Sequence, residues 1–276
     1  MSALVQAADL RHEVSGPAAP LLVDVRWSLD GPDHDGYATG HLPGAVFCDL
    51  DAQLAAPPGE GGRHPLPSAD QMSRTLQQLG IGAERDVVVY DGGNGSPAAR
   101  AWWCLRWAGH ERVRVLDGGL VAWVGAGGQL ESGEVVAQPV GEATARVGAM
   151  PTVSADDVLA GHVGTLLDVR APGRYRGESE PIDPVAGHIP GAVSLPISEM
   201  VADDGRLLPR DRLREVVVAA LPAADLPPVV TAYCGSGITA AQMVLALHEA
   251  GLHAALYPGS WSEWIADPSR PVATGD

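Results

Sequence analysis

The sequence predicts an α/β protein made of two tandem domains, each a parallel β-sheet flanked by helices. Two observations lead to this fold class. One series of short motifs occurs twice, in the same order, along the 276 residues. Within each half, short runs rich in β-branched residues alternate with stretches of helical pattern, which is typical of βα units around a parallel sheet.

The repeated motifs define the two copies. The matched pairs are LLVDVR at 21–26 with LLDVR at 166–170, GHLPGAV at 40–46 with GHIPGAV at 187–193, VVVYDGGNG at 87–95 with VTAYCGSG at 230–237, and LDGGLVAW at 116–123 with YPGSWSEW at 257–264. The interval between the two members is nearly the same for all four pairs. A constant interval indicates a duplicated domain.

The elements follow from local pattern. In the first copy, DVVVYD predicts a strand, SPAARAWWCLRWAG the helix after it, and RVRVLDGG the next strand. In the second copy, PVVTAY at 228–233 predicts a strand and TAAQMVLALHEAG at 239–251 a helix. The segment 129–150 is polar, Gly-rich and without sustained period, so it is interpreted as the interdomain linker. The predicted boundaries are 1–128 for the first domain and 151–276 for the second.

Composition excludes several function classes. The formal net charge of -16 leaves no positive field to gather phosphates, so nucleic acid and anionic membranes are not expected as partners. Lysine does not occur, which excludes Schiff-base and P-loop chemistry. No apolar run approaches the roughly 20 residues needed to span a bilayer.

Cysteine usage indicates a reducing compartment. The three cysteines, Cys48, Cys104 and Cys234, are too few for a framework of disulfides. The N-terminus lacks the basic segment and apolar core that mark a signal peptide. We therefore expect a cytoplasmic protein.

Cys234 lies where the strand at 228–233 gives way to a glycine-rich turn and a helix. In a doubly wound sheet, ligands bind at the carboxyl ends of the strands. Gly235 and Gly237 let the backbone curl so that N–H groups point at the sulfur, and the helix dipole adds to their effect. Such surroundings favour the nucleophilic thiolate and would also hold a persulfide anion. The alternative is a small buried hydrophobe at a strand end.

The other two cysteines, and the residue that corresponds to Cys234 in the first copy, support this interpretation. Cys104 lies in the aromatic-rich pattern AWWCLRW and Cys48 follows a His-Leu-Pro-Gly turn, so both are interpreted as core residues. Asp91 occupies the place in the first copy that Cys234 occupies in the second. Only the second copy therefore carries the nucleophile. Asp91 is interpreted as a remnant of a lost nucleophile rather than as a working base.

These motifs resemble those of the tandem-rhodanese sulfurtransferases, which include thiosulfate and 3-mercaptopyruvate sulfurtransferases. The resemblance rests on CGSGITA at 234–240, both GH[LI]PGA blocks, DVRAPGRYRG at 168–177 and the ending YPGSWSEW. It runs from Leu21 to Trp264, nearly the whole chain. In that family the first domain is inactive and the second carries the cysteine.

The resemblance implies a ping-pong mechanism. The Cys234 thiolate would take a sulfane sulfur from a small-molecule donor, become a persulfide, and pass that sulfur to a thiophilic acceptor. A thiol, cyanide or a thioredoxin-like protein would serve as acceptor. No organic cofactor and no metal is required, because N–H donors around the sulfur can stabilise both anions.

The resemblance gives two indications about the donor. The loop 235–237 reads Gly-Ser-Gly, as in the mercaptopyruvate enzymes, where thiosulfate-using rhodaneses have cationic residues. Mercaptopyruvate enzymes bind the substrate carboxylate with two arginines. Arg174 matches the first, and a guanidinium fork suits a carboxylate, but Asp183 stands at the second position. We expect Arg176 to compensate and 3-mercaptopyruvate to be the donor, with thiosulfate as the alternative.

The family is also described as using a Ser-His-Asp relay, with the His and Asp from the first domain. Ser236 would hydrogen-bond the donor's sulfur or keto oxygen, and His41 matches the histidine. Its acidic partner would be Asp33 or Asp35. The alternative for His41 is a turn-stabilising role common to both copies, because His188 occupies the same place in the second.

Further residues complete the expected site or its scaffold. The rest of the loop is assigned to donor binding and comprises Gly235, Gly237, Ile238 and Thr239. Asp24 and Asp168 at strand ends are interpreted as anchors of the fold. Trp27 matches a tryptophan beside the family's interdomain cleft, and ordinary packing is the alternative.

Two other function classes are disfavoured. A phosphatase built on a similar fold needs an arginine in the loop after its cysteine, and CGSGITAAQ contains none. The retained cysteine and loop glycines argue against the other class, a non-catalytic sulfur carrier or binding scaffold.

Overall fold

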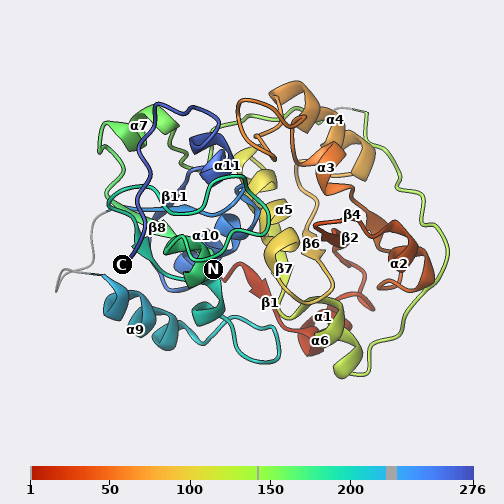
Figure 1. Ribbon diagram of the computed structural model, residues 1–276. Helices are drawn as coiled ribbons and strands as arrows, with labels where there is room; N and C mark the ends of the chain where they lie inside the picture. Colours follow the sequence, from red (N-terminus) through yellow and green to blue (C-terminus); the bar gives the residue numbers. More distant parts are fainter. Residues whose placement is uncertain (1, 142, 222–228) are drawn as a thin grey trace. The chain divides into compact units, whose positions relative to one another are not determined.

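The computed structural model describes residues 2–141, 143–221 and 229–276 (Figure 1). Met1, Glu142 in the predicted linker and Pro228 in the predicted strand lie outside the described residues. The chain divides into two units. Unit 1 consists of Met1–Ala56, Leu66–Met150 and Asp203–Arg206, and unit 2 of Pro57–Pro65, Pro151–Ala202 and Leu207–Asp276.

Unit 1 is built around a parallel sheet. Its elements are β1 (Leu4–Val5), α1 (Ala7–Glu13), β2 (Leu21–Asp24), β3 (Trp27–Ser28), β4 (Gly31–Pro32), α2 (His34–Thr39), β5 (Val46–Phe47), α3 (Leu50–Gln53), α4 (Ala69–Leu79), β6 (Val87–Tyr90), α5 (Ser96–Trp107), β7 (Val113–Leu116) and α6 (Gly119–Gly125). In its described residues, five strands pair in the order β1-β7-β6-β2-β5, all parallel. Strand β6 is buried along its whole length, as expected for the central strand of a sheet covered on both faces.

Unit 2 repeats this plan. Its elements are α7 (Ala155–Leu159), β8 (Thr165–Asp168), α8 (Pro172–Tyr175), β9 (Val193–Ser194), a 3₁₀ turn η1 (Ile197–Met200), α9 (Arg210–Ala220), β10 (Val230–Tyr233), α10 (Ile238–Glu249), β11 (Ala254–Leu256) and α11 (Ser260–Trp264). Within the described part of this unit, four strands pair in the parallel order β11-β10-β8-β9. Helix α10 packs on β10 and β11, as α5 packs on β6 and β7 in unit 1 (Figure 1). The predicted fold class is confirmed.

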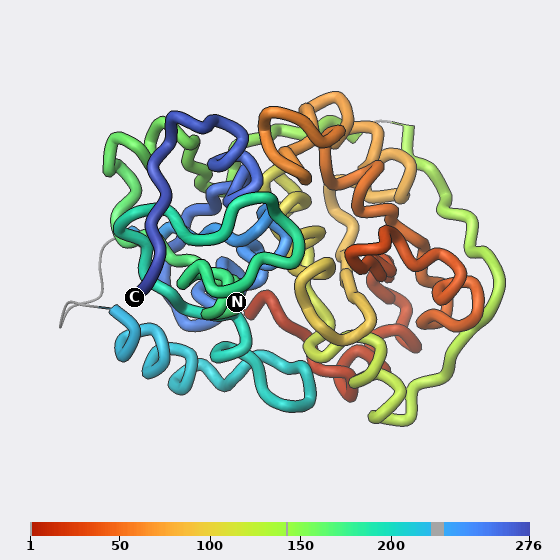
Figure 2. Tube along the Cα trace, in the orientation of Figure 1, coloured from red at the N-terminus to blue at the C-terminus, as the bar shows by residue number. Residues whose placement is uncertain are grey.

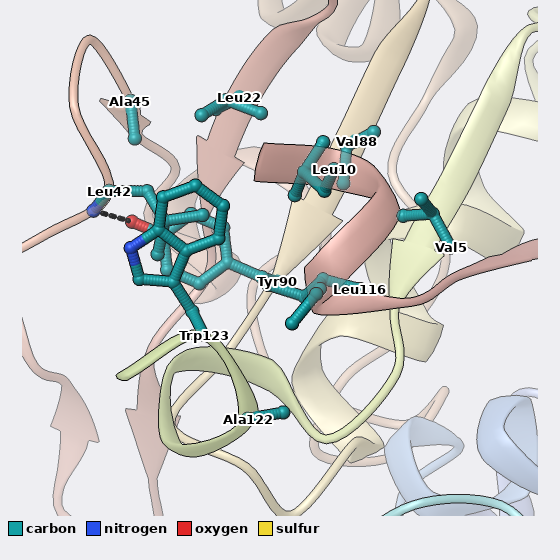
Figure 3. Close-up of a cluster of buried hydrophobic side chains, with 11 residues drawn as sticks. Val5, Leu10, Leu22, Leu42, Ala45, Val88, Tyr90, Leu116, Ala122 and Trp123 are labelled. Atoms are coloured by element: carbon teal, nitrogen blue, oxygen red, sulfur yellow. Dashed lines mark hydrogen bonds between the residues drawn. The ribbon is translucent and has the colours of Figure 1, made fainter. Parts of the chain in front are cut away.

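Each unit has a buried tyrosine in its hydrophobic core. In unit 1, Tyr90 lies among Leu10, Leu42 and Trp123, and its hydroxyl accepts a hydrogen bond of 3.1 Å from the backbone N–H of Leu42 (Figure 3). In unit 2, Tyr233 accepts the same bond from Ile189, also at 3.1 Å. The polar end of each tyrosine is therefore satisfied inside an apolar cluster, as buried hydroxyls require.

A buried ion pair anchors the repeated Gly-His turn. The carboxylate of Asp24, at the end of β2, accepts bonds from Nε and Nη2 of Arg26, and Nη2 also donates to the carbonyl of Gly40 at 2.8 Å. Unit 2 repeats the arrangement with Asp168, Arg170 and Gly187. The geometry agrees with the anchoring role expected of both aspartates.

The segment predicted as a linker packs along unit 1 (Figure 2). His41 and Glu131 exchange two backbone hydrogen bonds of 2.9 Å. Further along, the N–H of Val135 donates to the Tyr37 hydroxyl at 3.1 Å. The segment 129–150 is therefore tied to the first unit by its backbone, although its composition gives no sign of that.

Two short segments are exchanged between the copies. Pro57–Pro65 comes from the first copy and belongs to unit 2, whereas Asp203–Arg206 comes from the second copy and belongs to unit 1. Each contains a Gly-Arg pair, at 62–63 and 205–206. We refer to them as the exchanged segments.

Candidate active site

The cysteine loop connects β10 to α10 in unit 2. Strand β10 is buried throughout and ends at Tyr233, directly before Cys234. Gly237 has φ +83°, a left-handed conformation that favours glycine, and it caps the N-terminus of α10. The loop therefore lies at the carboxyl end of a central strand, where the sequence predicted it.

The sulfur of Cys234 receives a backbone hydrogen bond. The N–H of Gly237 donates to Sγ at 3.1 Å, and Cys234 is buried at the start of a 12-residue helix. The positive end of the helix dipole and this N–H both favour a negative charge on sulfur. The arrangement suits a thiolate and a persulfide anion.

The start of α11 holds the loop from the other side. The backbone N–H of Cys234 donates to Oγ of Ser260 at 3.1 Å, and the carbonyl of Cys234 accepts from Trp261 at 3.0 Å. The carbonyl of Gly235 accepts from the N–H of Ser262, also at 3.0 Å. Three consecutive residues of α11 therefore fix the first two residues of the loop.

In the corresponding loop of unit 1, Asp91 stands at the position of the cysteine. The carboxyl group of Asp91 accepts backbone hydrogen bonds from Gly93 at 2.8 Å, Gly95 at 3.2 Å and Ala98 at 3.1 Å. Burial raises the pKa of Asp91, and these N–H donors offset only part of that effect. The carboxyl group of Asp91 thus accepts the N–H groups of its own loop, in agreement with its interpretation as a remnant.

The other two cysteines lie in the core. Cys48 and Cys104 are free and buried, and burial raises the pKa of both thiols. Neither follows a strand that leads into a glycine-capped helix. Their surroundings therefore favour the neutral thiol.

Arg174 lies over the cysteine loop and is held by two carboxylates. Its Nε donates to Glu180 at 2.9 Å, and its Nη2 contacts Glu180 at 2.7 Å and Asp183 at 2.9 Å. A Cβ built on Gly235 would lie 3.6 Å from Nη2 and 3.7 Å from Nη1 of Arg174. The guanidinium group therefore faces the residue next to Cys234.

The pKa of Glu180 is lowered although its side chain is nearly buried. Burial alone would raise the pKa of Glu180, but hydrogen bonds from Arg174 and from the backbone N–H groups of Ile182 and Asp183 outweigh burial and lower it. Arg170 contacts the same carboxylate at 3.4 Å. Glu180 thus links the strand-end ion pair of Arg170 to Arg174.

Arg176 takes a different direction from Arg174. Its Nε and Nη2 both donate to Glu178 at 2.8 Å, and its side chain is about one-third exposed. Its carbonyl accepts from the N–H of Gly275 near the end of the chain. Arg176 is thus engaged by Glu178, and its expected part in carboxylate binding stays a prediction.

A second arginine, which the sequence pattern does not single out, lies beside Arg174 in place of the expected Arg176. Arg63, on the exchanged segment Pro57–Pro65, forms an ion pair with Asp183. A Cβ built on Gly235 would lie 2.8 Å from its Nη2. Two signals could have indicated it: the Gly-Arg pair recurs in both copies, and an acidic Asp183 in an expected arginine position needs a cationic partner.

The remaining predicted loop residues lie where the motif put them. Ser236 is buried, and within the described residues its hydroxyl makes no hydrogen bond. Ile238 and Thr239 form the first turn of α10, with Ile238 buried and Thr239 partly exposed. Ser236 therefore has a hydroxyl available to a ligand.

His41 belongs to unit 1, where it stacks on Tyr37 with ring centroids 4.2 Å apart. Its Nδ1 lies 2.9 Å from the Tyr37 carbonyl, and its buried Nε2 has no partner among the described residues. His188 makes the same contacts with Tyr175 in unit 2. Asp33 caps α2 by accepting from Gly36 at 2.9 Å.

The shared stacking supports a turn-stabilising role for both histidines. In the described part of the chain, neither Asp33 nor Asp35 bonds to the ring of His41. A catalytic role for His41 stays a prediction.

A cavity of about 390 Å³ lies beside the Asp91 loop of unit 1. Its wall includes Trp27, Asp30, Asp33, Asp91 and Asn94. Arg26 also lines this space, but it is paired with Asp24, so the three carboxyl groups around the space do not suit an anionic ligand. The indole N–H of Trp27 donates to Asp51 at 2.9 Å, which agrees with its packing alternative.

The described residues contain neither a metal-binding cluster nor a membrane-spanning helix. No cluster of three or more His, Cys, Asp and Glu side chains could hold a metal ion there. In the same residues no helix is both long enough and apolar enough to cross a membrane.

Known proteins share this sequence and architecture. The family model "Rhodanese-like domain" matches residues 6–126 and 154–267. SseB of Mycobacterium tuberculosis, which carries a thiosulfate sulfurtransferase name, is 46% identical over 99% of this chain and 97% of its own length. A Pseudomonas aeruginosa protein with a 3-mercaptopyruvate sulfurtransferase name is 45% identical over 99% and 98%.

A solved structure extends the likeness to the backbone. The crystal structure of SseA from Escherichia coli, presented as a 3-mercaptopyruvate sulfotransferase, matches with a TM-score of 0.81 at 33% identity. The match covers 95% of this chain and 100% of the solved one. The resemblance read from the motifs is confirmed.

Proposed function

The chain belongs to the rhodanese family and is a sulfurtransferase, and from this premise we propose that it moves a sulfane sulfur from 3-mercaptopyruvate to a thiophilic acceptor. The sulfur would travel as a persulfide on Cys234. The observation that carries the proposal is the loop itself. Cys234 faces a backbone N–H donor at a helix N-terminus, and Arg174 lies over the next residue.

The first half-reaction loads the cysteine. The Cys234 thiolate attacks the sulfur of 3-mercaptopyruvate, an S–S bond forms, and the C–S bond of the donor breaks. The electron pair of that bond stays on carbon as the enolate of pyruvate. The proton of the donor's thiol ends on this carbon, which gives pyruvate and the Cys234 persulfide anion.

Protein groups would lower the barrier of this step. The N–H of Gly237 favours negative charge on sulfur before and after transfer. Ser236 would donate to the keto oxygen as the enolate develops, with Gly235, Gly237, Ile238 and Thr239 shaping the space around the donor. His41 would carry the proton in this step.

The second half-reaction unloads the cysteine. A thiolate or cyanide attacks the outer sulfur, the S–S bond to Cys234 breaks, and its electrons return to Sγ as the thiolate. A small thiol, cyanide or a thioredoxin-like protein would serve as acceptor. Because a persulfide is lost in oxidising surroundings and the three cysteines are free, we propose a cytoplasmic location.

Thiosulfate is the second candidate donor. Two observations favour it: Asp183 replaces an expected arginine, and SseB, with its thiosulfate sulfurtransferase name, is 46% identical to this chain. The same thiolate would attack the sulfane sulfur and release sulfite, without a proton transfer. The two donors therefore differ in the anion that the site must bind.

Steady-state kinetics with both donors tests the proposal. We expect kcat/KM for 3-mercaptopyruvate, measured as pyruvate release, to exceed kcat/KM for thiosulfate, measured as thiocyanate formation from cyanide. Arg174→Ala should lower kcat/KM for 3-mercaptopyruvate about 10- to 100-fold, because a charge-assisted hydrogen bond to the donor is lost. A higher kcat/KM for thiosulfate would assign thiosulfate as the donor.

A further inference from the structure

Arg63 reaches the cysteine loop with a fixed backbone. Its N–H donates to Oγ of Ser262 at 3.1 Å. The preceding Gly62 packs so closely that a Cβ there would lie 2.8 Å from Ser262 Oγ and from the carbonyl of Gly259. Ser262 in turn donates its N–H to the carbonyl of Gly235. The exchanged segment Pro57–Pro65 is thus attached to the same turn that holds Cys234.

The side chains of Arg63 and Arg174 meet at one carboxylate. Nη1 of Arg63 binds Oδ1 of Asp183, and Oδ2 of Asp183 accepts from Nη2 of Arg174 at 2.9 Å. A Cβ on Gly235 would lie 2.8 Å from Nη2 of Arg63 and 3.6 Å from Nη2 of Arg174. Asp183 therefore bridges two guanidinium groups that converge beside Cys234.

Both guanidinium groups keep donors for a ligand. In the part of the chain that the structure describes, Nε and Nη2 of Arg63 and Nη1 of Arg174 have no hydrogen-bond partner. The side chain of Arg63 is 30% exposed and that of Arg174 14%. Free N–H groups on two neighbouring arginines match the two oxygens of a carboxylate.

The pair of arginines is specific to unit 2. In unit 1 the counterpart of Arg63 is Arg206, whose Cγ would lie 3.0 Å from a Cβ built on Gly118. The counterpart of Arg174 is Gly36, because each precedes the tyrosine that stacks on the repeated histidine. The pair formed by Arg63 and Arg174 therefore has no equivalent in unit 1, because a glycine stands at the position of Arg174.

We infer that Arg63 is the second carboxylate-binding arginine of the donor site and acts together with Arg174. Asp183, at the position where the resemblance leads one to expect that arginine, is a positioning residue that orients both side chains. Arg176 is not needed for this site, since it is engaged by Glu178. The inference rests on the proposed function, because it names the group that binds the donor's anionic end.

Kinetics of Arg63 variants test the inference. Arg63→Ala should raise KM for 3-mercaptopyruvate about 10- to 100-fold with much less change in kcat, because it removes a charged hydrogen-bond donor from the carboxylate. Arg63→Lys should restore part of the loss, since it keeps the charge but not the fork. Arg206→Ala is the matched control, because it removes the equivalent arginine of unit 1, and its KM should equal that of the wild type.

Intact mass separates failure of the inference from failure of the proposed function. At saturating 3-mercaptopyruvate, the wild type and Arg63→Ala should both gain one sulfur, about 32 Da, as a persulfide. If the wild type gains none, the proposed function fails. If both gain it and Arg63→Ala keeps the wild-type KM, Arg63 has only a structural role and the inference is overturned. If Arg63→Ala does not fold, Arg63→Lys decides: a wild-type KM overturns the inference.

A double-mutant cycle tests the positioning role of Asp183. Asp183→Asn should raise KM in the wild type and raise it by a smaller factor in Arg63→Ala, because one of the two side chains that it orients is then missing. Equal factors in the two backgrounds would show that Asp183 does not act through Arg63.

Discussion

At the scale of single residues, the cysteine loop depends on the hydroxyl of Ser260. Ser260 is fully buried, accepts from the N–H of Cys234 and donates to the carbonyl of Tyr257 at 2.9 Å. Its φ of +55° is the only left-handed backbone conformation of a non-glycine residue in the described chain. Gly119 has nearly the same φ, +54°, at the matching position of unit 1. The serine is therefore retained in a conformation that suits glycine.

Two substitutions of Ser260 distinguish the contribution of its hydroxyl group to stability from that of its backbone strain. Ser260→Ala should lower the free energy of unfolding by about 1–3 kcal/mol, because the buried N–H of Cys234 loses its acceptor while the strain remains. Ser260→Gly loses the same bond but relieves the left-handed conformation, so it should be about 1 kcal/mol more stable than Ser260→Ala. Urea denaturation measures both, and the reverse order would contradict this explanation.

Gly235 tests the approach of the arginines at the same scale. Its Cβ would lie 2.8 Å from Nη2 of Arg63, the far end of a flexible side chain. Gly235→Ala should therefore fold but displace that guanidinium and raise KM for 3-mercaptopyruvate about tenfold, equivalent to about 1.4 kcal/mol. Gly59→Ala, on the same exchanged segment with no atom within 4 Å of its Cβ, is the control. Equal KM values for the two variants would argue against the close approach of Arg63.

At the scale of elements, charges of alternating sign lead from strand β8 to the cysteine loop. They are, in order of contact, Asp168, Arg170, Glu180, Arg174, Asp183 and Arg63. Each carboxylate lies between arginines or at the strand end. Removing one of these charges should therefore leave the oppositely charged groups on both sides of it with one ion-pair partner fewer.

The pH dependence of stability follows from Glu180. Its pKa in the folded protein lies below the ordinary 4.5, so the unfolded chain binds more protons in this range. Glu180 thus contributes stability that is fully present above pH 4.5 and is lost as the pH falls through its folded-state pKa. Urea denaturation from about pH 6 to about pH 3 should show a shallower loss of stability for Glu180→Gln than for the wild type.

Glu111→Gln is the control for this pH series. It removes an exposed carboxylate that has no ion pair in the described residues. A slope for Glu180→Gln equal to those of the wild type and of Glu111→Gln would contradict the role given to Glu180.

The Asp91 loop gives a prediction for unit 1 at the same scale. Asp91→Ala leaves the N–H groups of Gly93, Gly95 and Ala98 without their acceptor, so the free energy of unfolding should fall by about 1–3 kcal/mol. Asp30→Ala, an exposed position, should change it little. Chemical denaturation distinguishes the two. An Asp91→Ala variant as stable as Asp30→Ala would show that the loop does not need its carboxyl group.

At the scale of the whole molecule, the sequence predicts those strands, helices and turns that a local pattern of residues determines. The predicted strand 228–233 and helix 239–251 correspond to β10, Val230–Tyr233, and α10, Ile238–Glu249. Both depend on apolar runs and on a glycine turn between them, which neighbouring residues specify. The position of Cys234 at this turn was predictable for the same reason.

Arg63 shows what the sequence could not predict. It is 120 residues from Asp183 along the chain, and composition does not reveal that its segment belongs to unit 2. The packing of 129–150 on unit 1 also depends on backbone hydrogen bonds that carry no side-chain signal. Long-range contacts of this kind follow from the tertiary fold and not from periodicity.

The central claim is that a single cysteine carries the sulfur. Cys234 is the one of the three cysteines with a backbone N–H donor to its sulfur at a helix N-terminus, among the residues that the structure describes. The direct test is the intact mass of the protein after incubation with 3-mercaptopyruvate. The wild type should gain one sulfur, about 32 Da, that a thiol acceptor removes, and Cys234→Ser should gain none. A wild type without the adduct, or a Cys234→Ser variant with it, would contradict the mechanism.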